Sequence, residues 1–371
     1  MGDLQKQVQA LLDERVDSGV EDGVQAAVYR RGAPVVDAVA GVADPETGRQ
    51  VAPDTLFYAA SMGKAVTATA AHVLVERGAF GYDTPVAELW PEFGAHGKDG
   101  ATVRHVLTHS VGVPAVPKDT TAEQLCDWDG MCRTIAATRP WWTPGQRVGY
   151  HAVTYGFILG EIVRRATGKR ISQVLAEEVA EPLGVADELY LGIPRSELGR
   201  VARMADDPVG TAVFASVASQ LPLFRAAAPA VIPDAAYGNR ADILTSDIPA
   251  GGTLTARAIA RMYAAMLDEV DGVRLISPDR LREVSTLATA GLEDEMTGAP
   301  STHALGYSVG WPGTSAPQDH PAIFGMVGIG VGAAYANRAT GVCVAVTRNR
   351  FNPIEMNVVE QVSDLVARAY P

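Results

Sequence analysis

The spacing of apolar residues at the start of the chain predicts a helix followed by two strands. Apolar residues recur at three- and four-residue intervals over 4–16, as one face of an amphipathic helix requires. Residues 23–43 are rich in Val and Ala, and the turn-forming tetrapeptide Arg-Gly-Ala-Pro at 31–34 interrupts them. We therefore expect a helix that leads into a pair of strands.

Helical patterns dominate the middle of the chain, and strand patterns return near its end. An Ala-rich segment over 61–78 ends at Gly78, and an apolar segment over 155–167 is stopped by Gly168. The later patterns predict a helix over 255–268, strands over 305–311 and 331–347, and a closing helix over 354–369.

Strands at both ends and helices between them predict an α+β fold. We expect an antiparallel sheet flanked by helices, in a domain built from 1–60 and 250–371. Residues 61–249 are expected to form an inserted, mainly helical domain, with the active site at the junction. Residues 205–252 are rich in Ala, Pro and Gly and have weak periodicity. They predict a long irregular loop that covers or lines a site.

Charge and composition narrow the classes of partner. The chain carries 31 Lys and Arg against 43 Asp and Glu, a net charge of −12. It also lacks a polybasic cluster, so neither nucleic acid nor an anionic membrane is an expected partner. The first residues lack a secretory signal pattern, and Cys126, Cys132 and Cys343 form no CxxC pair. We expect a cytoplasmic protein, with a processed secreted enzyme as the alternative.

Ser61 and Lys64 lie three residues apart at the start of the predicted helix 61–78. This spacing places both side chains on one helix face, so the amine can reach the hydroxyl. A Lys can accept the Ser proton if burial lowers its pKa. Residues 65–75 contain no charged side chain, which favours a buried Lys64. A helix-capping Ser61 with an exposed Lys64 is the alternative on this pattern alone.

A second motif follows about 90 residues later. Residues 141–156 read WWTPGQRVGYHAVTYG: the chain turns at Pro-Gly, passes Tyr150 and enters an apolar helix. Together with the tetrapeptide SMGK at 61–64, this motif resembles the serine β-lactamase/penicillin-binding-protein superfamily. It is most similar to the class C-like branch of esterases, β-lactamase-related hydrolases and acyltransferases. Further similar segments lie at 82–86, 106–114 and 251–257, and the resemblance spans about 24–351.

The resemblance implies roles for individual residues. Ser61 would be the acylated nucleophile, Lys64 its proton acceptor, and Tyr150 the group that shuttles a proton to the leaving or attacking atom. A Tyr beside a Lys cation can also have its phenolate stabilised and act as a base. The backbone N–H groups of Ser61 and Ile329, with Gly328 adjoining, are expected to form an oxyanion hole.

The chain departs from the family pattern at two motifs. The usual Tyr-x-Asn becomes Tyr150-His151-Ala152, and Met326 and Val327 replace the cationic or aromatic residue and the Thr of the third motif. The polar groups that hold a substrate carboxylate are therefore missing. We expect a neutral ester, thioester or amide as substrate rather than a β-lactam.

Three side chains are candidate substrate contacts: His151, Met326 and Trp142. For His151 the alternative is that it only orients its loop, and for Trp142 that it packs the domain junction. His105 and His109 are spaced as a metal pair but have no third ligand, so neither a metal nor another cofactor is expected.

The sequence thus predicts a serine hydrolase or acyltransferase that uses a small-molecule acyl donor and water, an amine or an alcohol as acceptor. Three hypotheses stay open at this point: a transacylase of natural-product assembly, a simple carboxylesterase, and a catalytically silent homologue that only binds a ligand.

Overall fold

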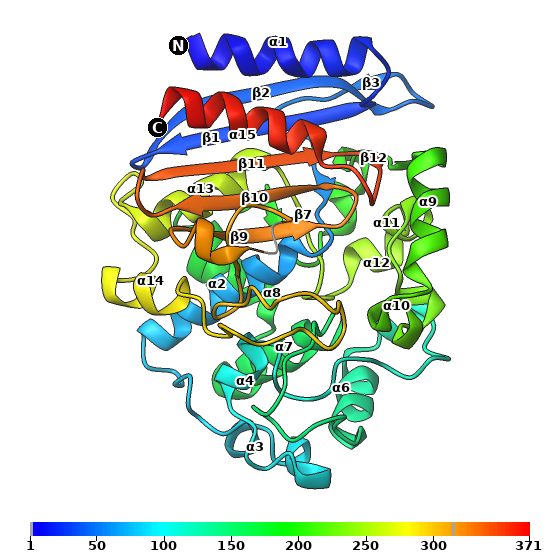
Figure 1. Cartoon of the computed structure of the whole chain (residues 1–371), viewed down its shortest axis with the longest axis vertical. Coiled ribbons are helices and arrows are strands. Elements are labelled where there is room, and N and C mark those ends of the chain that lie inside the picture. Colours follow the sequence, from blue (N-terminus) through cyan, green and yellow to red (C-terminus); the bar gives the residue numbers. More distant parts are fainter. Residues whose placement is uncertain (1–2, 314–315) are drawn as a thin grey trace.

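A seven-stranded antiparallel sheet forms the upper layer of the molecule in this computed structural model, which describes residues 3–313 and 316–371 (Figure 1). Its strand order is β3-β2-β1-β11-β10-β9-β8. The strands are β1 Gly23–Arg30, β2 Ala33–Asp44, β3 Arg49–Gln50, β8 Ser308–Val309, β9 Ile323–Gly328, β10 Gly332–Asn337 and β11 Val342–Arg348. Because β1 pairs with β11, strands from both ends of the chain meet at the centre of the sheet.

Strand β1 is buried on both faces, which explains its nearly continuous apolar sequence. Val24, Ala26 and Val28 point into one hydrophobic cluster, and Ala27 and Tyr29 point into another. This alternation follows from the two-residue period of a strand.

Helices cover both faces of the sheet. Helices α1 (Asp3–Asp17) and α15 (Asn357–Ala369) pack on one face, where they share a cluster with β1, β2 and β11. Helix α13 (Ala256–Leu267) packs against β1, β10 and β11 on the other face. Helix α2 (Met62–Glu76) lies between β9 and the helices of the lower layer. It thereby connects the sheet to the helical part.

The lower layer consists of short helices (Figure 1). They are α3 Val86–Leu89, η1 Pro91–Gly97, α4 Val103–Leu107, α5 Ala122–Leu125, α6 Trp128–Ala137, α7 Thr154–Thr167, α8 Ile171–Leu175, η2 Ala176–Ala180 and η3 Arg195–Arg200. Helix α2 contacts α7 and α8, so the helix that begins beside Ser61 is anchored on both layers. The domain boundaries expected from the sequence stay a prediction.

Residues 205–252 correct one expectation, because most of this segment is helical rather than irregular. Its elements are β6 Ala205–Asp206, α9 Pro208–Ala218, α10 Pro222–Ala226, η4 Pro229–Val231, α11 Ala235–Gly238 and α12 Ala241–Thr245. Pro208 and Pro222 begin their helices, and the Asp207 carboxylate accepts the Gly210 N–H at 2.7 Å as a cap. Apart from α9, these helices have five residues or fewer, too few to show an apolar period in a sequence.

The structure contains the five long helices that the sequence predicts and divides or shortens two of the predicted strands. The helices predicted over 4–16, 61–78, 155–167, 255–268 and 354–369 are confirmed within a few residues. The strand predicted over 305–311 shrinks to β8, since the chain turns at Ala304–Tyr307, and the strand predicted over 331–347 is two strands. The elements not yet described are β4 Phe57–Tyr58, β5 Leu189–Tyr190, β7 Thr253–Leu254, β12 Arg350–Phe351, α14 Pro278–Val284 and η5 Pro317–Asp319. No helix in the described part of the chain is long and apolar enough to span a bilayer.

Candidate active site

Ser61 lies in the tight turn between β4 and α2, at the N-cap of the helix. Ala60, directly before it, has a φ of +43°, a left-handed conformation that is unfavourable for a residue with a Cβ. The turn is held against a neighbouring backbone, because a Cβ on Gly63 would collide with the carbonyl oxygen of Gly251. The packing therefore fixes the Ser61 hydroxyl at the positive end of a buried helix.

The structure brings Ser61, Lys64 and Tyr150 together. The Lys64 Nζ lies 3.0 Å from the Ser61 Oγ, and the Tyr150 hydroxyl lies 2.8 Å from the same atom. The Lys64 Nζ also lies 5.1 Å from the centroid of the Tyr150 ring. One hydroxyl thus has two proton-exchanging groups within hydrogen-bond reach.

Lys64 is placed to act as a base. Its side chain is 1% exposed, and its amine donates a second hydrogen bond to the Ala250 carbonyl oxygen at 3.0 Å. No ion pair with a carboxylate is found for it among the described residues. Burial without a counter-charge lowers the pKa of Lys64 to about 7, so a neutral amine is available near neutral pH.

Tyr150 carries a neutral phenol in this environment. Burial raises its pKa well above the ordinary value of 10, and the hydrogen bond with Ser61 opposes this only in part. Its action as a phenolate base beside a Lys64 cation stays a prediction. Tyr150 is placed to donate a proton, and Lys64 to accept one.

Asp294 and His303, which no sequence motif singled out, hold Tyr150 in place together with His109. The Asp294 Oδ1 accepts the Tyr150 backbone N–H at 3.1 Å, and the ring of His303 lies nearly parallel to the Tyr150 ring, with centroids 6.2 Å apart. The His109 ring lies 4.9 Å from the Tyr150 ring. No motif or spacing connects positions 150, 294 and 303, so only the fold could reveal this group.

His151 and Trp142 contact the protein itself. Among the bonds of the His151 ring, Nε2 accepts the Val113 N–H at 3.0 Å and Nδ1 bonds the Gly149 carbonyl. The Trp142 Nε1 donates to the Ser110 carbonyl at 3.1 Å. Neither side chain lines the cavity at Ser61. Both thus hold the loop that carries Tyr150, and a substrate contact by either stays a prediction.

The two histidines considered as a metal pair also have structural partners. The His105 Nδ1 accepts the Thr102 N–H in a capping box, and the His109 Nδ1 accepts the His151 N–H at 3.0 Å. No group of three or more metal-ligating side chains is found among the described residues.

Ile329 lies beside Ser61 in the wall of the cavity. Within the described chain, the backbone N–H groups of Ser61 and Ile329 donate no hydrogen bond to another residue. Gly328 lets the end of β9 lie close to the turn between β4 and α2, because a Cβ at position 328 would collide with the Ala59 carbonyl oxygen. Two free donors beside a nucleophile match the requirement of an oxyanion hole.

A cavity of about 190 Å³, called the acyl cavity below, opens at Ser61. Lys64 is its single ionisable amine, and most of the lining is apolar. The apolar lining includes Leu223, Phe224, Ala227, Val231, Ile232, Pro233, Ile248, Val327 and Ile329. Helices α10, α11 and their connections supply much of this wall, so the segment over 205–252 does line the site.

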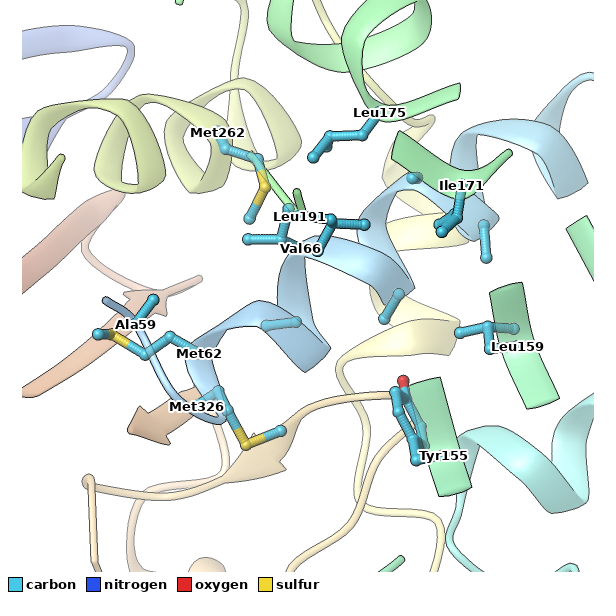
Figure 2. Close-up of a cluster of buried hydrophobic side chains, with 14 of the residues drawn as sticks. Ala59, Met62, Val66, Tyr155, Leu159, Ile171, Leu175, Leu191, Met262 and Met326 are labelled. Atoms are coloured by element: carbon cyan, nitrogen blue, oxygen red, sulfur yellow. The ribbon is translucent and has the colours of Figure 1, made fainter. Parts of the chain in front are cut away.

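Met326 lies outside the acyl cavity. It is 6% exposed and belongs to the same hydrophobic cluster as Met62 and Tyr155 (Figure 2). It also lines a second cavity, to which Tyr150 contributes as well. Val327 lines both cavities, and neither side chain offers a polar group to a substrate anion.

The fold and site define a class of protein: α+β proteins with a Ser-x-x-Lys motif, in which a buried Lys and a Tyr both contact the hydroxyl of a half-buried Ser. A family model described as Beta-lactamase matches residues 8–368, and the chain therefore belongs to this family. The esterase/beta-lactamase LipL of Mycobacterium tuberculosis is 36% identical, over 90% of this chain and 79% of LipL. Esterase EstB of Burkholderia gladioli is 29% identical, over 85% of this chain and 81% of EstB.

Solved structures agree with this assignment. The structure of a family VIII carboxylesterase superposes with a TM-score of 0.86 at 28% identity, covering 99% of this chain and 98% of that chain. A penicillin-binding protein homologue from Caulobacter crescentus superposes with a TM-score of 0.82 at 29% identity, covering 99% of this chain and 98% of the other. The family and fold expected from the sequence are confirmed.

Proposed function

We propose that this protein is a serine esterase that forms an acyl-enzyme on Ser61. The observation that carries the proposal is the pair of hydrogen bonds that Lys64 and Tyr150 make to the Ser61 Oγ at the mouth of an apolar cavity. Relatives named as esterases, LipL and EstB, support it.

The geometry supports an acylation step in which every proton has a place. Neutral Lys64 takes the Ser61 proton as Oγ attacks the ester carbonyl, and the N–H groups of Ser61 and Ile329 stabilise the oxyanion. Tyr150 protonates the leaving alcohol as the carbon–oxygen bond breaks. The Lys64 ammonium then returns a proton to Tyr150. Deacylation follows the same steps in reverse order, with a water molecule in the place of the alcohol.

The lining of the site favours a neutral ester with an apolar acyl group. The side chains of Met326 and Val327 provide no hydrogen bond for a carboxylate, and the described residues that line the two cavities include no Arg. We therefore expect weak or no hydrolysis of β-lactams, whose carboxylate needs such a partner. Acyl transfer to an amine or alcohol, and a place in natural-product assembly, stay predictions from the sequence.

Hydrolysis of p-nitrophenyl butyrate tests the proposal. We expect turnover by the native protein, none by Ser61→Ala, and unchanged turnover by Ser216→Ala. Ser216 is the matched control because it is an exposed serine on α9 whose hydroxyl donates to the Val213 carbonyl oxygen, away from the site. A fluorophosphonate should label Ser61 alone. A folded protein that neither turns over the ester nor takes the label would be the ligand-binding homologue instead.

A further inference from the structure

The second cavity has a volume of about 360 Å³ and adjoins the acyl cavity. Tyr150, Leu223 and Val327 line both cavities. The lining of the second cavity differs, because it is rich in hydroxyl groups and its described residues include no Lys or Arg. The polar side chains among them are Tyr150, Asp294, Thr297, Ser301, Thr302, His303, Ser308, Trp311 and Tyr335.

The position of Tyr150 determines which part of an ester each cavity receives. The leaving oxygen must lie beside the group that protonates it, and in the proposed mechanism that group is the Tyr150 hydroxyl. The acyl cavity contains Ser61, Lys64 and Ile329, which surround the carbonyl carbon. The alcohol part of the ester therefore extends past Tyr150 into the second cavity.

His303 is fixed in this second cavity by a buried carboxylate. The Asp294 Oδ2 lies 3.0 Å from the His303 Nε2, while its Oδ1 accepts the N–H groups of Tyr150 at 3.1 Å and Met296 at 2.9 Å. Burial raises the pKa of Asp294, but the bonds from His303 and these N–H groups outweigh burial and leave it below its ordinary value. Asp294 is thus an anionic acceptor, and Nε2 is the nitrogen of His303 that donates to it.

The other ring nitrogen of His303 is left for a ligand. In the neutral ring with hydrogen on Nε2, Nδ1 carries a lone pair and accepts a hydrogen bond. Among the described residues Nδ1 has no hydrogen-bond partner. It is also not completely buried, so a ligand in the cavity can reach it. The His303 side chain is 8% exposed, and it lines the cavity. A fixed acceptor among neutral hydroxyls suits a ligand that carries O–H groups.

We propose that the second cavity binds the alcohol part of esters of hydroxylated alcohols, such as glycerol monoesters, and that the His303 Nδ1 accepts a hydrogen bond from a free hydroxyl of that alcohol. The proposal rests on the proposed esterase function, because it places the alcohol by the role of Tyr150. It adds the substrate class and names His303 as a specificity-determining residue.

Two butyrate esters with three-carbon alcohols test this proposal. Glycerol monobutyrate and n-propyl butyrate share the acyl group, and only the first has free hydroxyls. We expect kcat/KM for the glycerol ester to be about tenfold higher in the native protein, the worth of one well-placed hydrogen bond. Equal values for the two esters would overturn the proposal.

A single substitution separates binding by His303 from its support of Tyr150. A Gln side chain reaches the position of Nε2 and can still donate to Asp294, but it places no acceptor at the position of Nδ1. We expect His303→Gln to reduce the preference to about one, because kcat/KM falls further for the glycerol ester than for the two esters without free hydroxyls. Loss of the ring beside Tyr150 should lower all three esters by a common factor, so the ratio of the glycerol ester to the n-propyl ester is the readout, and the exposed control His96→Gln should leave that ratio unchanged.

The remaining outcomes are also decisive. If His303→Gln lowers turnover of all three esters equally, His303 acts only by supporting Tyr150 and the proposal is wrong. If His303→Gln keeps the native preference, the hydroxyls bind elsewhere and the proposal is again wrong. If the native protein turns over none of the esters and Ser61 takes no label, the esterase function itself has failed, which is a different result.

Discussion

Two lysines of this chain are almost completely buried, and their surroundings differ. Lys98, at the C-terminal end of η1, is 0% exposed and donates to the carbonyl oxygens of Ala95 at 2.8 Å, Ala136 at 3.0 Å and Thr138 at 2.6 Å. Lys64, in α2, is 1% exposed and contacts one carbonyl oxygen and the Ser61 hydroxyl.

The difference shows that burial alone does not make a base. Three carbonyl oxygens match the three hydrogens of an ammonium, so Lys98 is held as a cation at the end of α6, where the helix dipole favours positive charge. Lys64 has one partner that can only accept, the Ala250 carbonyl oxygen, and its second partner, the Ser61 hydroxyl, can either donate or accept. Burial lowers the pKa of both amines, to about 7 for Lys64. The partners then decide which amine is free to exchange a proton.

The largest expected effect comes from removing each amine in turn. Lys64→Met should lower kcat/KM for p-nitrophenyl butyrate by about 10³-fold or more, because Ser61 loses its base. Lys98→Met should keep kcat/KM within about threefold while lowering the free energy of unfolding by about 2–3 kcal/mol, because three carbonyl oxygens lose their donor. Ester kinetics and urea unfolding of both variants measure the two effects. An inactive but folded Lys98→Met protein would remove the distinction between the two sites.

Tyr150→Phe is expected to have the next largest effect. Loss of the proton donor should lower kcat/KM for ethyl butyrate by about 10²- to 10³-fold, within the range of general acid–base catalysis. The loss should be smaller for p-nitrophenyl butyrate, since p-nitrophenolate leaves without needing a proton. Kinetics with both esters measure the difference. Equal losses for the two esters would mean that Tyr150 does not protonate the leaving group.

The pH profile sharpens the contrast between a base and a fixed cation. Because Lys64 must be neutral to act and its pKa is about 7, kcat/KM should rise about tenfold per pH unit below pH 7 and level off above it. Lys64→Arg should be inactive at every pH tested, since Arg keeps its proton. Steady-state kinetics from pH 5 to 9 measure both profiles. A flat profile across pH 6–8 would contradict the assignment of Lys64.

The last prediction concerns stability. The pKa of Lys64 is lower in the folded chain, about 7, than the ordinary 10.5, so the unfolded chain binds more protons between these values. The free energy of unfolding of the native protein, relative to Lys64→Met, should therefore rise with pH by about 1.4 kcal/mol per unit in that window. Urea unfolding at several pH values measures it. An unchanging difference between the two proteins would mean that burial does not destabilise the Lys64 ammonium.

The sequence predicts what depends on local spacing. Ser61 and Lys64 share one face because a helix has a fixed period, and the apolar helices and the strand pair over 23–43 follow from the same regularity. Asp294 and His303 escaped prediction because their contacts with Tyr150 join segments more than 140 residues apart along the chain. Within 205–252, α10, α11 and α12 escaped prediction because each has five residues or fewer, and α9 escaped because its sequence is apolar without an amphipathic period.

The most direct test of the central claim is the titration of the lysine side chains themselves. The chain has five lysines, so labelling their Cε atoms with ¹³C gives few signals to resolve by NMR, and Lys64→Met and Lys98→Met assign the two buried ones. We expect the Lys64 signal to titrate with a midpoint near pH 7, and the Lys98 signal to titrate at a higher pH, because three carbonyl oxygens hold its ammonium. A Lys64 that stays protonated above pH 9 in the folded protein would contradict its role as the base that activates Ser61.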